Sequence, residues 1–238
     1  MEAIILAAGY GTRLWETHPE AKNKPKGLFK YNGRPVIDYV VEGLLKVPEI
    51  SRIILVTNDR FFMQFNAWRS NYDAKGEKGI YVLNDKSTGP ENRLGSIGDL
   101  KHAIEQMRVD DDVLVVASDY AFLFDFKQLY DFYQKIGKSI TLTTTMTEQE
   151  ISGKHGNILV DGDWRVTRFV EKPEQAFSPL SSVACYVVSK SDFKYLGECI
   201  AEKKDATGYL FEKLLEKSEL YAFNVPREEV VSIDQLIK

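Results

Sequence analysis

The chain is poor in cysteine and contains no long apolar segment. Only two of its 238 residues are cysteines, Cys185 and Cys199, and their spacing does not match a metal site. We therefore expect two reduced, buried thiols rather than a disulfide framework. After the N-terminus the apolar runs, such as 113–117, are far shorter than the ~20 residues that a membrane helix needs. The first residues include an acid, Glu2, and too few apolar positions for a signal peptide, so we expect a cytoplasmic protein without a membrane partner.

Basic residues are not in excess either. The chain has 31 Lys and Arg against 35 Asp and Glu, which gives a net charge of −4. A general nucleic-acid binder needs a basic surface to displace counterions, so no nucleic-acid partner is expected. A local cationic pocket for a phosphorylated small molecule is compatible with this balance. The 44% hydrophobic content is sufficient for a sizeable core and excludes a disordered or fibrous chain.

Segments typical of strands and helices alternate in the first half of the chain. Strand-like runs lie at 3–6, 52–57, 80–83 and 113–117, and segments with helical spacing lie at 35–47, 98–107 and 123–136. Such alternation predicts β-α-β crossovers and a mainly parallel sheet that is covered on both faces.

The second half has a different pattern. Strand-like segments at 139–146, 157–160, 165–170 and 183–188 precede helical segments at 191–203 and 209–216, and the turn 161–164 predicts a hairpin. No linker rich in Gly, Ser or Pro separates the halves, about 1–125 and about 126–238, so they should share one sheet. We predict a single domain, 1–238, with a Rossmann-like three-layer α/β/α fold and a mixed, mainly parallel central sheet.

A glycine loop follows the first predicted strand. Gly9 and Gly11 would let backbone N–H groups approach phosphate oxygens, while Arg13 and Lys26 add cationic side chains. A dinucleotide fingerprint does not fit, because Leu14 stands where a third small residue is needed. A P-loop does not fit either, because no Gly-Lys-Ser/Thr follows. From the glycines alone, an ordinary tight turn remains an alternative.

The wider pattern resembles a known family. The stretch 6–14, LAAGYGTRL, followed by Pro25-Lys26, resembles the signature of the nucleotide-sugar pyrophosphorylases, the sugar-1-phosphate nucleotidyltransferases. Similar family segments lie at 33–37 (GRPVI), 94–98 (LGSIG) and 169–173 (FVEKP). The resemblance implies a Mg²⁺-dependent enzyme of nucleotide-sugar biosynthesis. It would join an NTP to a sugar 1-phosphate by in-line attack on the α-phosphorus and release pyrophosphate.

The resemblance also implies roles for individual residues. Arg13 and Lys26 would hold the triphosphate and the departing pyrophosphate, and Lys172 would hold the acceptor phosphate; with Asp119 they form the implied catalytic set. The first half would bind the nucleotide and the second half the acceptor. The implied nucleotide-binding residues are Leu6, Ala8, Gly9, Gly11, Thr12, Arg13, Lys26, Gly95 and Ser96, and the implied acceptor-binding residues are Gly156, Glu171 and Lys172.

Two carboxylates match the metal-binding positions of the family. Asp119 ends the predicted strand 113–118, where open α/β sheets bind ligands, although its neighbours Ser118 and Tyr120 differ from the family's Gly-Asp-Asn. Asp234 matches the last acid of a second family motif. The three aspartates at 110–112 precede a strand, at the opposite end, and are better explained as a solvated turn.

Other functions stay open at this point. The same chemistry could use phosphocholine or a polyol phosphate as the acceptor. A non-catalytic regulatory homologue is a further alternative, and the presence of Arg13, Lys26, Asp119 and Lys172 argues against it. A glycosyltransferase of similar fold would need an Asp-x-Asp motif, which 119–121 lacks. The polar loop 84–90 should lie near the base pocket, but the residues do not identify the base, the acceptor or the oligomeric state.

Overall fold

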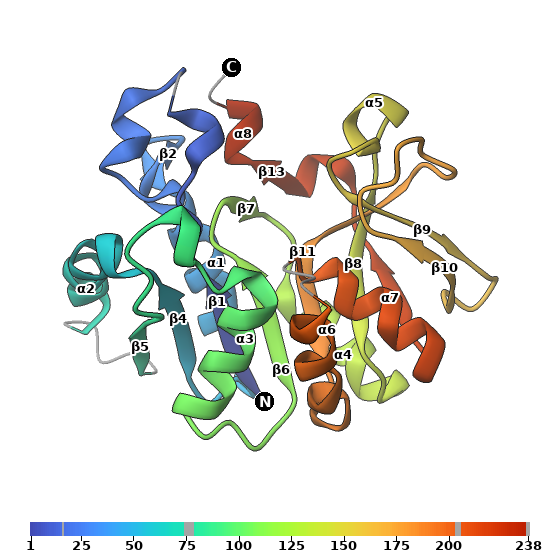
Figure 1. Ribbon diagram of the computed structural model, residues 1–238. Helices are drawn as coiled ribbons and strands as arrows, with labels where there is room; N and C mark the ends of the chain where they lie inside the picture. Colours follow the sequence, from blue (N-terminus) through green and yellow to red (C-terminus); the bar gives the residue numbers. More distant parts are fainter. Residues whose placement is uncertain (16, 74–78, 203–205, 237–238) are drawn as a thin grey trace.

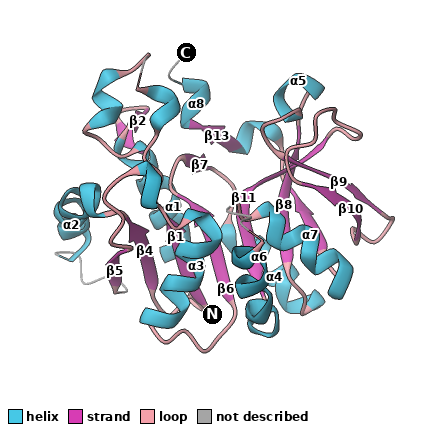
Figure 2. Cartoon of the chain, viewed as in Figure 1, coloured by secondary structure: helices cyan, strands magenta, loops and turns pink. Residues whose placement is uncertain are grey.

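The computed structural model describes residues 1–15, 17–73, 79–202 and 206–236, without the side chains of residues 13, 73, 235 and 236. One nine-stranded sheet runs through both halves of the chain, with helices on both sides (Figures 1 and 2). This confirms the predicted α/β fold with a mixed central sheet.

The first half of the chain forms the parallel part of the sheet. Its strands are β1 (Glu2–Leu6), β4 (Ile53–Thr57), β5 (Ile80–Asn84) and β6 (Val113–Ala117). They stand in the order β6-β1-β4-β5, and all three of these pairings are parallel. The aliphatic runs of β1, β4 and β6 are almost completely buried, as expected for central strands that are covered on both faces.

The second half extends the same sheet, mostly through antiparallel pairings. Its strands are β8 (Ile140–Thr145), β9 (Gly156–Val160), β10 (Val166–Val170), β11 (Leu180–Val188) and β12 (Tyr221–Asn224). The last of them, β12, pairs parallel with β8. Strand β11 pairs antiparallel with β6, β8 and β9, and β9 and β10 form the predicted hairpin. The long strand β11 therefore joins the two halves along one backbone ladder.

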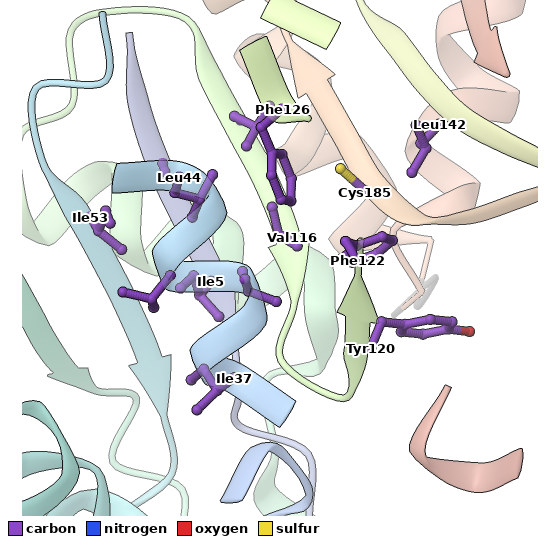
Figure 3. Close-up of a cluster of buried hydrophobic side chains, with 14 of the residues drawn as sticks. Ile5, Ile37, Leu44, Ile53, Val116, Tyr120, Phe122, Phe126, Leu142 and Cys185 are labelled. Atoms are coloured by element: carbon purple, nitrogen blue, oxygen red, sulfur yellow. The ribbon is translucent and has the colours of Figure 1, made fainter. Parts of the chain in front are cut away.

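Helices cover the two faces of the sheet. On one side pack α1 (Val36–Leu45), α2 (Asp59–Asp73) and α4 (Phe126–Ile136); on the other pack α3 (Gly95–Gln106), α6 (Leu196–Ala201) and α7 (Gly208–Lys217). Figure 3 shows Ile37 and Leu44 of α1 beside Ile5 of β1. Burying each side chain of this size stabilises the fold by about 2 kcal/mol. Both cysteines are free and buried within these layers, as predicted.

Short elements above the sheet bring distant segments together. The strand β7 (Tyr120–Phe122) pairs antiparallel with β13 (Val230–Ser232), and α8 (Ile233–Leu236) follows directly. Three further short elements also lie outside the main sheet. They are the two-residue strands β2 (Lys30–Tyr31) and β3 (Arg34–Pro35) and the helix α5 (Glu148–Ile151). Figure 1 shows α8 and β13 beside the N-terminal loops, above the end of β6.

Several predicted boundaries were wrong for local reasons. The helix predicted at 123–136 begins at Phe126, because the Asp125 side chain caps it by accepting a hydrogen bond from the Lys127 N–H at 2.9 Å. The segment predicted as one helix at 191–203 is a 3₁₀ turn, Lys190–Tyr195, followed by α6. The buried Asp192 accepts a 2.6 Å hydrogen bond from Ser139, which fixes that first turn. The strands β7, β12 and β13 were not predicted.

Candidate functional site

Two adjoining cavities lie at the carboxyl ends of β1 and β6. The first, here called the glycine-loop chamber, has a volume of about 350 Å³ and is lined by Leu6, Ala8, Gly9, Arg93, Gly95, Ser96, Asp99, Lys172 and Gly208, among others. The second, the hairpin chamber, has a volume of about 380 Å³ and is lined by Asp119, Glu150, Lys154, His155, Gly156 and Asp234, among others. Glu171, Ala184 and Tyr186 line both, so the two chambers meet at these residues.

The glycine loop is held against the end of β4. The amide of the buried Asn58 donates a 2.9 Å hydrogen bond to the Ala8 carbonyl, and the Ala7 N–H donates to the Val56 carbonyl at 2.8 Å. Gly11 has φ +66°, a left-handed conformation that favours glycine. A Cβ there would lie 3.7 Å from the Lys26 side chain, so Gly11 and Lys26 are neighbours. The loop thus presents its backbone to the chamber from a rigid base.

A short 3₁₀ segment follows this loop, Thr12–Leu14. Thr12 is exposed in it. Arg13 belongs to the same segment, but its side chain lies outside the described residues.

Lys26 brings the two predicted metal carboxylates together. Its Nζ lies 2.6 Å from Asp234 Oδ1 and 3.5 Å from Asp119 Oδ2. Asp119 lies just after Ser118, beyond the end of β6. The Ile233 N–H donates a 2.9 Å hydrogen bond to the Asp119 carbonyl, which holds α8 beside that strand end. The positive charge of the Lys26 ammonium offsets the repulsion between these two neighbouring carboxylates. Their oxygens are ligands of the kind that Mg²⁺ prefers.

The predicted acceptor-binding residues lie where the chambers meet. The Glu171 side chain is only 9% exposed, and its Oε1 lies 3.6 Å from Lys172 Nζ. The Glu171 backbone N–H donates a 2.6 Å hydrogen bond to Glu212 Oε1. A Cβ at Gly156 would lie 3.1 Å from Glu171 Oε2 and 2.8 Å from the Phe169 ring, and a Cβ at Gly208 would overlap the Glu171 carboxylate. Both glycines therefore leave the space that this buried carboxylate occupies.

Charged groups line the far wall of the hairpin chamber. Arg227 donates a 3.1 Å hydrogen bond to Glu150 Oε1. The pKa of Glu150 is lowered to about 2, chiefly by the Thr147 backbone N–H, with further contributions from Arg227. The pKa of His155 is lowered by burial and then by Arg227. This wall offers both donors and acceptors of hydrogen bonds to a bound polar molecule.

The structure places most of the predicted site residues in these chambers or beside them. Leu6, Ala8, Gly9, Gly95, Ser96 and Lys172 line the glycine-loop chamber, Asp119, Gly156 and Asp234 line the hairpin chamber, and Glu171 lines both. Each chamber is lined by residues from both halves of the chain. Lys172 and Gly208 of the second half line the glycine-loop chamber, and Asp119 of the first half lines the hairpin chamber.

Sequence reasoning missed several lining residues. Thr207, Gly208 and Tyr186 belong to no motif of the sequence, although Thr207 donates a 3.0 Å hydrogen bond to the predicted Ser96. The sequence does mark Asp99, because it is an acid on the apolar face of a predicted helix and follows the segment 94–98 directly. Both it and Thr207 are buried.

No helix among the described residues combines the length and the apolarity required to cross a membrane.

The predicted turn at 110–112 lies at the opposite end of β6, where Asp111 pairs with the N-terminal ammonium at 2.6 Å and Asp110 with Lys190 at 2.6 Å. These acids take no part in the chambers.

Comparisons with known proteins identify the family of the chain. A family model described as nucleotidyl transferase matches residues 2–229. The chain is 30% identical over 230 residues to the mannose-1-phosphate guanyltransferase of Debaryomyces hansenii, covering 94% of this chain and 59% of that protein. It is 28% identical over 229 residues to the mannose-1-phosphate guanylyltransferase catalytic subunit beta of Danio rerio, again covering 94% and 59%. The chain thus spans about three fifths of the length of these curated relatives.

Solved structures share the fold. A UDP-glucose pyrophosphorylase complexed with UDP-glucose superimposes with a TM-score of 0.76 at 20% identity, covering 94% of this chain and 89% of that one. The inositol-1-phosphate CTP transferase of T. maritima superimposes with a TM-score of 0.70 at 16% identity, covering 95% and 86%.

Proposed function

The chain belongs to the nucleotidyl transferase family, and from this premise we propose that it joins a nucleoside triphosphate to a sugar 1-phosphate, giving an NDP-sugar and pyrophosphate. The observation that carries the proposal is the junction of the two chambers at Glu171. Lys172 lies on one side of this junction, and the group of Lys26, Asp119 and Asp234 lies on the other. A reaction between two phosphorylated molecules needs two adjoining sites with cations beside them.

The proposed reaction requires little acid–base catalysis by the protein. The phosphate of the acceptor is already anionic at neutral pH, so no general base is needed for its attack on the α-phosphorus. In this mechanism Lys26, with Arg13, holds the triphosphate and neutralises the charge that develops on the leaving pyrophosphate. Lys172 holds the acceptor phosphate in line. The backbone of the glycine loop, with Gly95 and Ser96, surrounds the nucleoside in the glycine-loop chamber.

Asp119 and Asp234 would hold a Mg²⁺ ion. Both are hard oxygen donors that follow the ends of strands and share the Lys26 ammonium, so this donor set fits the ion. When bound, Mg²⁺ would supply positive charge to the phosphates during the transfer. The chain's own part is to fix the two carboxylates, through the ladder between β7 and β13 and through the hydrogen bond from Ile233 to Asp119.

The acceptor that we favour is a sugar 1-phosphate. The wall of the hairpin chamber combines Glu150, Lys154, His155 and Glu171, which can donate hydrogen bonds to sugar hydroxyls and accept them. The names of the curated relatives, mannose-1-phosphate guanyltransferases, support the same substrate class. Phosphocholine and polyol phosphates remain the competing acceptors in the test.

A substrate panel tests this proposal. The common NTPs are combined with sugar 1-phosphates, phosphocholine and polyol phosphates, and Mg²⁺-dependent pyrophosphate release is measured for each pair. We expect release with at least one sugar 1-phosphate. Release only with phosphocholine or a polyol phosphate would move the substrate class, and release with no pair would contradict the catalytic proposal.

A further inference from the structure

Lys172 has an unusual backbone conformation. Its φ is +50°, in the left-handed region that residues with a Cβ rarely adopt. Of the described residues other than glycine that have a positive φ, only Lys172 precedes a proline. A residue before proline normally has an extended backbone, because the proline ring crowds the helical conformation. Strain of this kind persists only where the surrounding structure fixes the residue, and it is concentrated at functional sites.

Hydrogen bonds on three consecutive residues fix this segment. The Glu171 N–H donates to Glu212 Oε1 at 2.6 Å, and the Lys172 N–H donates to the His155 carbonyl at 3.2 Å. The carbonyl of the following proline accepts from the Gly153 N–H at 2.8 Å. Of these three bonds only the first uses a side chain, that of Glu212. A single substitution can therefore remove this bond while the other two, which join backbone groups, are retained.

Glu212 is itself held by the packing of its helix. It lies in the second turn of α7, and its neighbours Phe211 and Leu214 are completely buried. The Phe211 ring stacks on Tyr186, with the ring centroids 4.5 Å apart. Glu212 lines neither chamber, whereas Tyr186 lines both. Glu212 can therefore affect a bound acceptor through the segment of Lys172 and not by touching the acceptor.

The two residues of this segment differ in how freely they can move. The Glu171 side chain is 9% exposed, and the backbones of Gly156 and Gly208 lie so close that a Cβ at either would meet its carboxylate. The Lys172 side chain is 45% exposed. A return of Lys172 to a negative φ would turn its side chain by about 100° or more around the N–Cα bond. Loss of the bond to Glu212 should therefore be felt mainly at Lys172.

We propose that Glu212 is a positioning residue for the acceptor phosphate. Its carboxylate holds the Glu171 N–H and so keeps Lys172 in the left-handed conformation in which it lines the glycine-loop chamber. The inference rests on the proposed function, which gives Lys172 the phosphate of the acceptor. It makes binding of the acceptor, and not of the NTP, depend on α7.

Steady-state kinetics of the full chain test this role, with the NTP and acceptor that give the fastest Mg²⁺-dependent pyrophosphate release. Glu212→Ala and Glu212→Leu both remove the oxygen that accepts the hydrogen bond, and leucine also fills the space that alanine leaves. We expect each to raise KM for the acceptor about tenfold, as for the loss of one charge-assisted hydrogen bond, and to change KM for the NTP less than about twofold. Glu212→Gln keeps an oxygen acceptor and should keep KM for the acceptor within about threefold of the parent.

Glu216 provides a matched control on the same helix. It lies one turn after Glu212, is exposed and lines neither chamber. Glu216→Ala and Glu216→Leu should leave both KM values at those of the parent. Urea unfolding of every variant measures any general loss of structure, which would lower kcat through the fraction of folded enzyme but would not raise one KM alone.

The outcomes separate this inference from the proposed function. An unchanged KM for the acceptor in both Glu212→Ala and Glu212→Leu, an equal rise of both KM values, or a Glu212→Gln variant that behaves like Glu212→Leu would each overturn the inference. These results would leave the transferase standing, because the parent must release pyrophosphate for them to be measured. Absence of release by the parent with every pair would reject the proposed function, and the role of Glu212 with it.

Discussion

Replacing Asp99 by asparagine should change how the stability of the protein depends on pH. The pKa of Asp99 is about 8 in the folded protein against an ordinary 3.8, because of burial and then the charge of Asp85. Between these two values the folded carboxyl keeps its proton, while the same group in the unfolded chain has lost it. The folded state then binds one proton more than the unfolded state, so the free energy of unfolding falls as the pH rises.

The magnitude follows from that one-proton difference. It corresponds to about 1.4 kcal/mol per pH unit, so Asp99 should remove about 3 kcal/mol of stability between pH 5 and pH 7. Asparagine has no proton to lose, and Asp99→Asn should gain that amount relative to the parent over the same interval. His155, whose pKa is lowered, has the opposite slope, because its folded form binds fewer protons. It is present in both proteins and cancels in the difference.

Urea unfolding at pH 5, 6 and 7 measures this change, with the free energy of unfolding extrapolated linearly to water. The difference between the Asp99→Asn variant and the parent should grow with each pH unit. Asp99→Leu, which also lacks the proton, should show the same growth even if its stability at any one pH differs. If both variants run parallel to the parent, Asp99 is ionised in the folded protein and the reasoning is refuted.

Three further predictions concern the chambers. Lys26→Ala should lower kcat for pyrophosphate release by about 100-fold or more. The control is Lys101→Ala, which removes an exposed lysine of α3 paired with Glu105 and should leave kcat unchanged. Equal kcat values for the two variants would contradict the role of Lys26. Asp234→Asn should raise the Mg²⁺ concentration needed for half-maximal activity, and an unchanged Mg²⁺ titration would remove Asp234 from the metal site. Gly208→Ala should raise KM for the acceptor, because its Cβ would displace the carboxylate shared by the two chambers. Gly162→Ala, in an open turn, is the control, and similar KM values for the two variants would contradict that account.

The elements that could be predicted from the sequence are those with a strong local pattern. The aliphatic runs of β1, β4 and β6 and the helical spacing of α1 are visible without any tertiary information, and each formed where it was expected. The strand β12 was missed because its pattern is short, with Ala222 buried between half-buried Tyr221 and Phe223. It is a strand because β8 offers it a parallel edge, and that edge is a property of the assembled sheet.

The residues of the candidate site were likewise predictable only where a local motif contains them. The motifs located the glycine loop, the end of β6 and the segment of Glu171, because these residues keep a fixed order along the chain. They did not locate Gly208 or the pairing of Asp85 with Asp99. The need for glycine at 208 comes from the Glu171 carboxylate on another element, and the pairing of Asp85 with Asp99 joins a loop to a helix. Neither feature is visible in the spacing of neighbouring residues.

The ladder between β6 and β11 has a mechanical consequence. Val115 of β6 is in register with Tyr186 of β11, and both line the glycine-loop chamber. Tyr186 also lines the hairpin chamber, so hydrogen-bonded strands about 4.8 Å apart form a floor that the two chambers share. The halves of the chain cannot rotate about this floor without breaking backbone hydrogen bonds. Entry of the proposed substrates and release of their products should therefore depend on side chains at the edges of the chambers, such as the partly exposed Lys172, rather than on closure of one half of the chain over the other.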